Sequence, residues 1–351
     1  MWPDGAVRGK PVVPRTWRAT TDVELGFATQ RGSRVRVHRL VDRHPPRHSP
    51  VPAGVVRQRA WRRPVGTSRP PHSTRLTASS RKEESMFDPG TEFDGATVVL
   101  TGAAGVIGRW LAAAFAQAGA RLVLSDVREE ALQEVADELG LGNDRVRLHA
   151  TELRDPASVQ ALIDTTVATF GAPRVVVNNA GIYPSGFLLD LEVDDWDRMF
   201  DVNLRAPFLV GVGFARTMIA DGMHGAIINI GSGAARSMRA TMVPYCTSKT
   251  ALDRLTKGMA VELAEFGIRV NAVEPGFAPG SHVSNLTDAH VEATSAKIPL
   301  GRVSGPEDAP SAVLYLASSH ASYITGATLS VDGGNSAGSR VVYQDKKRAG
   351  V

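Results

Sequence analysis

Seven short apolar runs, separated by stretches with helical periodicity, constrain the fold of this chain more than any other feature of its sequence. Strands are predicted over residues 96–101, 121–126, 145–150, 174–178, 226–231, 268–273 and 326–331. Helices of matching length are predicted between them, over residues 106–119, 128–139, 156–170, 194–220 and 244–266. Strands and helices that alternate in this way build a parallel sheet with helices on both faces. The pattern therefore predicts an α/β protein with a Rossmann-type, doubly wound, seven-stranded parallel sheet in a single domain spanning residues 86–334.

Charge divides the chain near Met86. Residues 1–85 carry 18 basic residues, 16 of them Arg, against 6 acidic residues, whereas the remaining 266 residues carry 22 basic against 30 acidic. The first segment also holds 10 of the 21 prolines and shows neither helical nor strand periodicity. Such a segment cannot bury enough apolar surface to offset the entropy of ordering, so residues 1–85 are predicted to be a disordered, basic extension. Residues 335–351 also lose the apolar periodicity and are predicted to form a loose C-terminal tail.

Three interpretations of residues 1–85 remain open. A basic arm would attract the phosphates of a nucleic acid, and an Arg-rich, acid-poor segment is also typical of a transit peptide. The third interpretation is translated sequence upstream of a true start at Met86. The richness in Arg, Pro and Trp, with little Lys, favours this third interpretation. No nucleic acid is expected to bind the core domain.

The numbers of cysteines and histidines and the lengths of the apolar runs restrict the cellular compartment and the binding partners that the sequence allows. The one cysteine, Cys246, excludes an intramolecular disulfide and is predicted to be a packed side chain instead of a reactive thiol. No run reaches the ~18 apolar residues that a membrane span needs. The 9 His residues and the one Cys form no pattern typical of metal ligands. The sequence therefore predicts a cytoplasmic protein with no membrane partner and no metal.

A glycine-rich turn follows the first predicted strand. Thr101 to Gly108 reads TGAAGVIG, with glycines at 102, 105 and 108. Gly102 permits a sharp turn and Gly108 allows a helix to pack closely on the sheet, so backbone amides and a helix N-terminus would face a bound pyrophosphate. The spacing differs from G-x-G-x-x-G, and a plain Gly/Ala-rich connection remains the alternative.

A carboxylate ends the second predicted strand, 18 residues past Gly108. In a dinucleotide-binding fold, Asp126 at this position accepts hydrogen bonds from the adenosine ribose hydroxyls and repels a 2′-phosphate. It therefore favours NAD over NADP as the cofactor. Asp126 could instead cap the next helix, and Arg121 and Arg128 could come near a phosphate.

A tyrosine and a lysine lie four residues apart near the start of a predicted helix. Tyr245 and Lys249 therefore share one helix face. An ammonium beside a tyrosine favours the phenolate and can make it a useful acid/base. Ser232, at the end of the fifth predicted strand, is placed to hold a substrate oxygen beside the tyrosine. The alternatives are a solvated Tyr/Lys helix face and a serine that only serves a turn between two glycines.

The order of these motifs resembles that of the short-chain dehydrogenase/reductase family over residues 92–334. The matching motifs are Thr101–Gly108, Asn178–Gly181, Asn203, Ser232, Tyr245 with Lys249, Pro275–Gly276 and Asp332–Gly334. The resemblance implies an NAD(P)-dependent oxidoreductase that interconverts a secondary alcohol and a ketone by hydride transfer, acting on CH–OH donors. It also implies a homotetramer or homodimer formed through the two long helices.

The resemblance also implies the site residues. Tyr245 would be the acid/base and Ser232 would position the substrate oxygen. Lys249 would hold the nicotinamide ribose and lower the pKa of Tyr245, and Asn203 would keep a water for proton relay. Cofactor binding is implied for Gly102, Gly105, Ile107, Gly108, Asp126, Glu152, Leu153, Asn179, Ala180, Gly181, Tyr245, Lys249, Pro275 and Gly276.

Three positions depart from the family pattern. Val106 stands where many members have glycine, and the glycine falls at 105 instead. The carboxylate that follows the third strand is Glu152, which is one methylene longer than usual. After Pro275–Gly276, Phe277 replaces a threonine that usually contacts the nicotinamide carboxamide. These changes bear on cofactor binding and leave the catalytic set intact.

The substrate is less well defined. Tyr183, Met238, Met242, Phe277 and a mobile segment 278–298 are expected to face it, which suggests a partly hydrophobic alcohol or ketone. Two other functions remain open: a dinucleotide-binding protein that kept the fold without catalysis, and a sugar-nucleotide epimerase, suggested only by the glycine spacing.

Overall fold

Seven parallel strands form one sheet in the computed structural model, which describes residues 92–280 and 286–338. The order is β3-β2-β1-β4-β5-β6-β7. The strands are β1 (Thr97–Thr101), β2 (Arg121–Asp126), β3 (Val146–Ala150), β4 (Val175–Asn178), β5 (Ala226–Ile230), β6 (Arg269–Pro275) and β7 (Thr328–Val331). The predicted doubly wound α/β fold is therefore confirmed. The predictions for residues 1–85, and for most of the tail at 335–351, lie outside the described residues.

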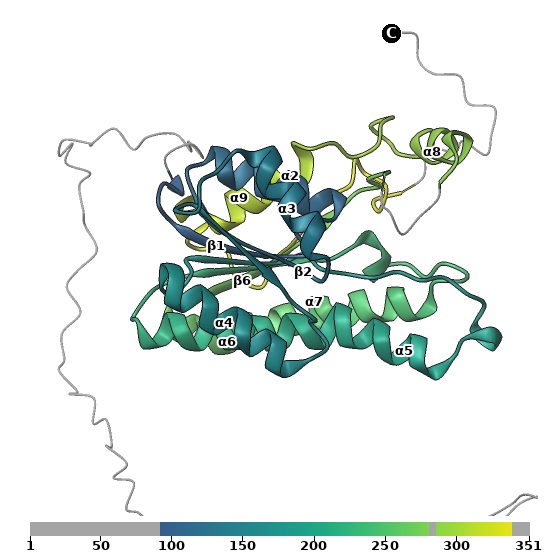
Figure 1. Cartoon of the computed structure of the whole chain (residues 1–351). Coiled ribbons are helices and arrows are strands. Elements are labelled where there is room, and N and C mark those ends of the chain that lie inside the picture. The colour runs from purple at the N-terminus through teal and green to yellow at the C-terminus, as the bar shows by residue number, and fades with distance from the viewer. Residues whose placement is uncertain (1–91, 281–285, 339–351) are drawn as a thin grey trace, which may run out of the picture. The chain divides into compact units, whose positions relative to one another are not determined.

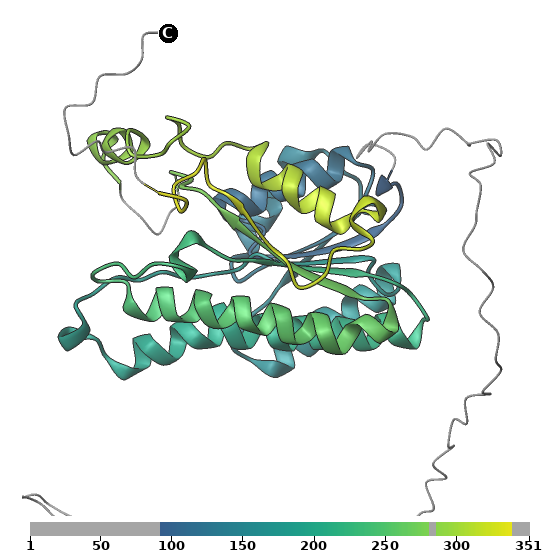
Figure 2. The ribbon, with the colours of Figure 1, turned by 180° about the vertical axis from the view of Figure 1, so that it is seen from behind.

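Helices cover both faces of the sheet (Figure 1). The helices α2 (Val106–Gln117), α3 (Glu129–Leu139) and α9 (Asp308–Ala317) lie on one face. The other face is covered by α4 (Pro156–Phe170), α6 (Ala206–Ala220) and α7 (Val243–Leu263), and Figure 2 shows α7 from behind in green. Within the described ranges, no helix is both long and apolar enough to span a lipid bilayer.

Alternating strand residues supply two separate cores. In β1, Val98 and Leu100 join the core that includes Phe115 of α2, whereas Val99 joins the core that includes Phe214 of α6. All five residues of β1 are buried, because a strand in the middle of a parallel sheet is covered on both faces. The near-continuous apolar runs in the sequence are the direct result.

The sheet order reverses between β1 and β4, the point at which open α/β sheets bind ligands. The chain leaves β1 for β2 in one direction and returns to place β4 on the opposite side. The loops that follow these two strands therefore diverge and leave a crevice at the carboxyl edge of the sheet. The candidate active site lies at this edge.

Three helical segments differ from the prediction. The predicted helix 194–220 is divided into α5 (Val193–Phe200), a π-helical turn at Asp201–Arg205, and α6. The predicted helix 244–266 ends as an α-helix at Leu263 and finishes in a 3-10 turn. The segment expected to be mobile contains α8 (Asp288–Ser295), which buries none of its residues.

The helix α9 was not predicted at all. Its sequence, DAPSAVLYLA, carries a proline at its third position, which resembles a break between elements. Proline is tolerated there because the first-turn amides of a helix have no intrahelical partner. The helix buries Val313 and Leu316 against the sheet.

Candidate active site

A cavity of about 620 Å³ lies where the loops after β1, β2, β3 and β4 meet. Seven residues of the predicted cofactor set line it: Gly102, Asp126, Glu152, Leu153, Asn179, Ala180 and Gly181. Val106, Val127 and Ile182 add apolar wall, and Arg128, Arg154 and Arg198 add positive charge at its border. The structure therefore brings the first half of the predicted site together. The side chain of Ile107 packs against the core on the α2 face.

The three glycines of the turn are not equivalent. Gly102 has φ +64°, and a Cβ there would lie 2.7 Å from the Cα of Ala180. A Cβ on Gly108 would lie 2.1 Å from the Gly102 carbonyl oxygen. Gly105 has room, since the nearest atom to a Cβ there is 3.4 Å away. Gly102 and Gly108 are thus required for the turn itself, and the half-buried side chain of Val106 enters the cavity wall.

Asn179, the first residue after β4, fixes the glycine turn from the side. The side-chain amide of Asn179 donates to the carbonyls of Thr101 at 3.0 Å and Gly102 at 2.9 Å. In return, the Thr101 hydroxyl accepts from the amides of Asn179 at 3.1 Å and Ala180 at 3.2 Å. Thr101 is the first residue of the TGAAGVIG motif. Its role as an acceptor shared by two amides depends on the pairing of β1 with β4, and no pattern in the neighbouring sequence indicates it.

Asp126 is 8% exposed and faces both the cavity and the turn. One carboxylate oxygen accepts from the amide of Ala104 at 3.2 Å. The other accepts from the amide and the guanidinium of Arg128, both at 3.2 Å. The alternative role as a helix cap is not what the structure shows, because Arg128 occupies the cap position of α3.

Glu152 lies at the outer border of the same cavity. Its carboxylate forms a two-point ion pair with Arg154, at 3.0 and 2.9 Å. The hydrogen bond from Arg154 holds the pKa of this carboxyl below its usual range. Glu152 and Asp126 each have an arginine beside them.

Tyr245 and Lys249 lie one turn apart in α7, as their spacing predicted. Lys249 is 4% exposed, and its ammonium donates to the carbonyl of Ile230 at 2.8 Å. The ammonium nitrogen lies 5.9 Å from the centroid of the Tyr245 ring. Burial lowers the pKa of Lys249 to about 8.

The pKa of Tyr245 is raised, not lowered. Although part of the ring surface is accessible, the phenol lies among enough protein that burial disfavours the phenolate. A hydrogen bond with the Ser232 hydroxyl and the positive charge of Arg239 act in the opposite direction, while Tyr183 adds to the rise. Among the groups that act on Tyr245, Ser232 and Arg239 lower its pKa. A lowering of this pKa by Lys249 stays a prediction.

Ser232 has two roles in the structure. It follows β5, and its hydroxyl accepts from the amide of Ala234 at 3.2 Å, which caps the short turn Gly233–Ala235. The same hydroxyl forms the hydrogen bond with Tyr245. The two interpretations of this serine are thus compatible, because the turn is what aims its hydroxyl at the tyrosine.

Asn203 explains the π-helical turn between α5 and α6. Its fully buried amide accepts from the amide of Ile182 at 2.8 Å and donates to the Ile182 carbonyl at 2.8 Å and the Ser248 hydroxyl at 3.2 Å. A π-turn widens a helix by one residue and often occurs at functional positions. Asn203 therefore joins the loop after β4 to α7. Ser248, its partner on α7, was not identified from the sequence.

Gly181 shows how tightly these groups converge. A Cβ built on Gly181 would lie 3.4 Å from the Asn203 side-chain oxygen and 3.5 Å from the Lys249 nitrogen. Gly181 also lines the cavity. The cavity and the catalytic set are therefore contiguous.

Of the residues expected to face the substrate, Tyr183 lies beside Tyr245. The rings of Tyr183 and Tyr245 are 6.0 Å apart and nearly perpendicular. The amide of Gly186 donates to the Thr241 carbonyl at 2.9 Å, which joins the loop after β4 to the loop before α7. Thr241 has φ +66° and, among the described residues, is the one non-glycine residue with a positive φ. Met238 is 66% exposed.

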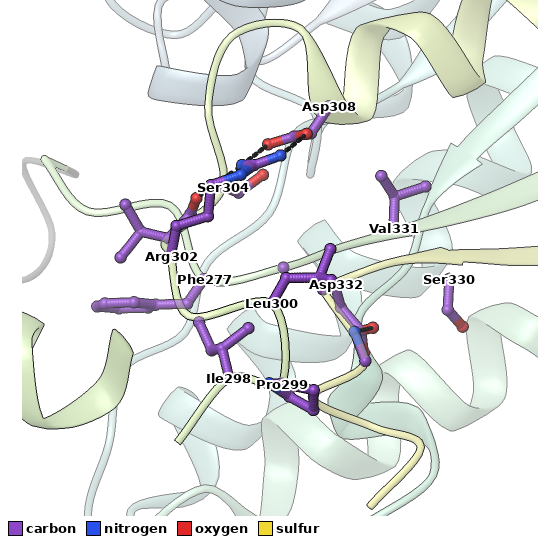
Figure 3. Close-up of a pocket in the computed structure, with 14 residues that line it drawn as sticks. Phe277, Ile298, Pro299, Leu300, Arg302, Ser304, Asp308, Ser330, Val331 and Asp332 are labelled. Carbon is purple, nitrogen blue, oxygen red and sulfur yellow. Dashed lines mark hydrogen bonds and ion pairs between the residues drawn. The ribbon is translucent and has the colours of Figure 1, made fainter. Parts of the chain in front are cut away.

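A second cavity, of about 440 Å³, lies beside Gly276 and Phe277 (Figure 3). Its walls are mostly apolar, with Arg302 and Asp308 in a two-point ion pair at 2.6 and 2.7 Å. That pair holds the pKa of Asp308 at about 2. Of the residues predicted to bind the cofactor, Gly276 lines this second cavity. The described residues contain no group of three His, Cys, Asp or Glu side chains placed to hold a metal ion.

Comparisons with known proteins agree with this architecture. A family model described as enoyl-(acyl carrier protein) reductase matches residues 102–336. The chain is 40% identical over 250 residues to the cis-4-hydroxycyclohexanecarboxylate dehydrogenase of Sinomonas cyclohexanicum, covering 71% of this chain and 99% of that protein. It is 34% identical over 242 residues to the 3-oxoacyl-(acyl-carrier-protein) reductase FabG of Escherichia coli K12, covering 69% and 98%. A crystal structure of a gluconate 5-dehydrogenase from Burkholderia cenocepacia J2315, in complex with NADP and tartrate, matches with a TM-score of 0.65 and 34% identity, covering 72% and 98%.

Proposed function

Because this chain belongs to the short-chain dehydrogenase/reductase family, we propose that it is an NAD(P)-dependent oxidoreductase that interconverts a secondary alcohol and a ketone. The observation that carries this proposal is the convergence of Tyr245, Ser232 and Lys249 beside a dinucleotide-sized cavity. Proteins that match over the same region are named as dehydrogenases of a cyclic hydroxy acid and of gluconate, and as a 3-oxoacyl reductase.

The residues present fit a nicotinamide dinucleotide. Gly102 lines the cavity with backbone alone, and Asp126 offers a buried carboxylate to ribose hydroxyls. Gly108 lets the helix start pack against this turn. We assign the holding of the cofactor to these residues together with Asn179 to Gly181 and Lys249. When bound, a nicotinamide dinucleotide supplies hydride transfer to or from the carbinol carbon.

The protein's own residues handle the oxygen and its proton. In ketone reduction, the Tyr245 phenol donates its proton to the carbonyl oxygen; in alcohol oxidation, the phenolate takes the hydroxyl proton. Ser232 holds the same oxygen by a hydrogen bond. Asn203 keeps a water close to Lys249, from which the proton lost or gained by Tyr245 is exchanged with solvent.

A cofactor-reduction assay tests the proposal. The full chain is assayed with NAD and with NADP over a panel of secondary alcohols that includes cyclic hydroxy acids and sugar acids, and in reverse with ketones. Tyr245→Phe is expected to lower kcat by a factor of about 10² to 10⁴, since it removes the proton donor, while leaving cofactor binding unchanged. Equal activity of both proteins would refute the role of Tyr245. Cofactor binding without turnover by either would favour the non-catalytic alternative.

We infer a preference for NAD from Asp126. A 2′-phosphate placed beside this buried carboxylate would meet a negative charge, although Arg128 and Arg154 stand close by. The solved gluconate 5-dehydrogenase is in complex with NADP, so the proposed preference depends on Asp126 and not on this relative. Asp126→Ala is expected to raise KM for NAD by about tenfold or more, because a hydrogen bond to a charged group is worth about 1.5–3 kcal/mol. A wild-type preference for NADP would contradict the assignment.

We also propose that the protein is a homodimer or homotetramer. Exposed apolar side chains occur on both long helices of one face, with Phe208 and Ile219 on α6 and Val261 on α7. Burial of such side chains against a second copy is the usual way to remove them from water. Light scattering coupled to gel filtration measures the mass; a monomer at micromolar concentration would contradict the proposal.

A further inference from the structure

One arginine joins the turn of Ser232 to three other segments of the chain. Arg236 lies four residues after Ser232. One nitrogen of its guanidinium group contacts a side chain in each of these three segments. The partners are the Glu274 carboxylate on β6 at 2.5 Å, the Ser330 hydroxyl on β7, and the Ser336 hydroxyl beyond β7 at 2.7 Å. We call these four residues the Arg236 clasp. The proposed reaction uses none of them.

Glu274 lies directly behind the turn. It is 2% exposed, and a Cβ built on Gly231 would lie 3.1 Å from its Cγ. The Ser330 hydroxyl also donates to the Glu274 carboxylate, at 3.1 Å. A buried carboxylate that loses its cationic partner is costly, so Glu274 and Arg236 depend on each other. The charged groups that act on Glu274 are Arg236, Asp253 and Asp332.

Ser336 lies against the opposite side of the same turn. A Cβ built on Gly233 would lie 3.5 Å from the Cβ of Ser336 and 3.8 Å from the carboxylate of Asp332. Asp332 in turn accepts from the amides of Gly334 at 3.0 Å and Ser336 at 2.8 Å. The turn is therefore held between Glu274 on one side and the segment after β7 on the other.

The turn needs this support because of its own composition. Ser232 stands between Gly231 and Gly233, and glycines allow the backbone more conformations than any other residue. Within the turn, the ties are the Ala235 amide to the Ser232 carbonyl at 2.9 Å and the Ser232 cap on Ala234. Two further hydrogen bonds reach beyond the turn: the Gly231 amide donates to the Val273 carbonyl on β6 at 2.7 Å, and the Thr250 hydroxyl on α7 donates to the Ala235 carbonyl at 2.8 Å. The clasp adds the side-chain links from the turn to β7 and to the segment after it.

We propose that Arg236 and Glu274 are positioning residues, which fix the glycine-flanked turn so that the Ser232 hydroxyl meets the Tyr245 phenol. The inference rests on the proposed function for its kinetic consequence only. Removal of the clasp leaves the hydrogen bonds of Gly231 and Ala235 in place but frees the turn from β7 and from the segment after it. The Ser232 hydroxyl then occupies its productive position for a smaller fraction of the time. The effect is therefore transmitted through Ser232 and not through the cofactor.

A kinetic double-mutant cycle tests whether Arg236 acts through Ser232. Arg236→Ala is expected to lower kcat by about tenfold while leaving KM for the cofactor unchanged, since positional errors at a reacting group are costly. In a Ser232→Ala background, the same change is expected to cost less than about twofold. Equal losses in both backgrounds would mean that Arg236 acts independently of Ser232, and the proposal would fail.

Two matched variants separate positioning from general stability. Arg174→Ala removes another arginine–glutamate pair, with Glu92, at the opposite end of the sheet; it is expected to lower stability without changing kcat. Arg236→Lys places an ammonium, with three protons, near the three acceptors and is expected to restore at least half of the lost kcat. A loss of kcat in Arg174→Ala equal to that in Arg236→Ala would indicate a structural effect alone.

A spectroscopic reading keeps this inference distinct from the proposed function. The hydrogen bond from Ser232 lowers the pKa of Tyr245. Titration of the Tyr245 phenolate absorbance, identified by difference from Tyr245→Phe, is therefore expected to move upward in Arg236→Ala in the same direction as in Ser232→Ala. If no substrate is turned over but Arg236→Ala moves the midpoint in the wild-type background and not in the Ser232→Ala background, where loss of charge alone would still act, the clasp stands and the proposed activity fails. An unmoved midpoint in Arg236→Ala overturns the clasp.

Discussion

The two halves of the carboxyl edge of the sheet are built in opposite ways. On the cofactor side, after β1 to β4, backbone packs on backbone: Gly102 and Gly108 leave no space for a Cβ, and Asp126 is 8% exposed. On the substrate side, after β4 and β5, side chains project outward. Leu189 is 97% exposed and Met238 is 66% exposed.

This difference matches what each half has to recognise. A dinucleotide presents the same groups to every enzyme that uses it, so a fixed cradle is suitable. Substrates vary between enzymes, and loops on a rigid scaffold are where such variation is accommodated. The same contrast explains why Thr241, the strained residue, is found on the substrate side, whereas the cofactor side excludes strain by using glycine.

The largest effect on stability and binding is expected from a substitution on the cofactor side. Gly108→Ala would place a Cβ 2.1 Å from the Gly102 carbonyl oxygen, a backbone atom that cannot rotate away. We expect a loss of about 3 kcal/mol in the free energy of unfolding, together with loss of NAD binding. Denaturant unfolding and fluorescence titration with NAD measure the two quantities.

Gly105→Ala is the matched control for that substitution. Its Cβ would meet only the Gly102 carbonyl oxygen, at 3.4 Å, and Gly105 has φ −76°, which alanine adopts without strain. Stability is expected to stay within about 0.5 kcal/mol of wild type. Similar losses in Gly105→Ala and Gly108→Ala would show that the turn is sensitive everywhere and that the contrast between the glycines is wrong.

A smaller effect on stability is expected on the substrate side, from relief of the backbone strain at Thr241. Thr241→Asn should raise the free energy of unfolding by about 1 kcal/mol, because asparagine tolerates a positive φ better than a β-branched residue does. Thr241→Pro forces φ to about −65° and should withdraw the Thr241 carbonyl from the Gly186 amide, which raises KM for the substrate. Neither variant should change KM for NAD. A destabilised Thr241→Asn would show that the threonine side chain itself stabilises the loop.

The parts of this molecule that could be predicted from sequence are those with a local signal. The buried strands are apolar runs, and the glycine turn lies between a strand and a helix. Tyr245 and Lys249 share a face because of helical spacing. Asp126 marks the end of β2. In each case the residues that define the feature are separated by a few positions.

The remaining features depend on contacts between distant parts of the chain. Arg236 meets Glu274 across 38 positions and Ser336 across 100. Asn203 meets the Ile182 backbone across 21 positions, from within the π-turn that interrupts the predicted long helix. Thr241 has a positive φ, which a threonine disfavours, and its carbonyl accepts from the amide of Gly186, 55 positions away. No periodicity or spacing encodes these contacts.

The smallest predicted effect is on pH dependence, and it involves a residue of the substrate side acting on the catalytic tyrosine. Burial raises the pKa of Tyr245, and the guanidinium of Arg239 lowers it again. Alcohol oxidation needs the phenolate, so its rate should rise as pH approaches this pKa, whereas ketone reduction, which needs the phenol, should fall. Arg239→Ala removes the opposing charge and should move both limbs to higher pH. Arg239→Lys keeps the charge and should leave both limbs close to wild type.

Lys249, with its pKa at about 8, also titrates within the pH–rate profile, so the variants are compared with one another over the whole profile. If Arg239→Ala left both limbs in place, the exposed loops would not influence the tyrosine electrostatically, and the two halves would be more independent than the structure indicates.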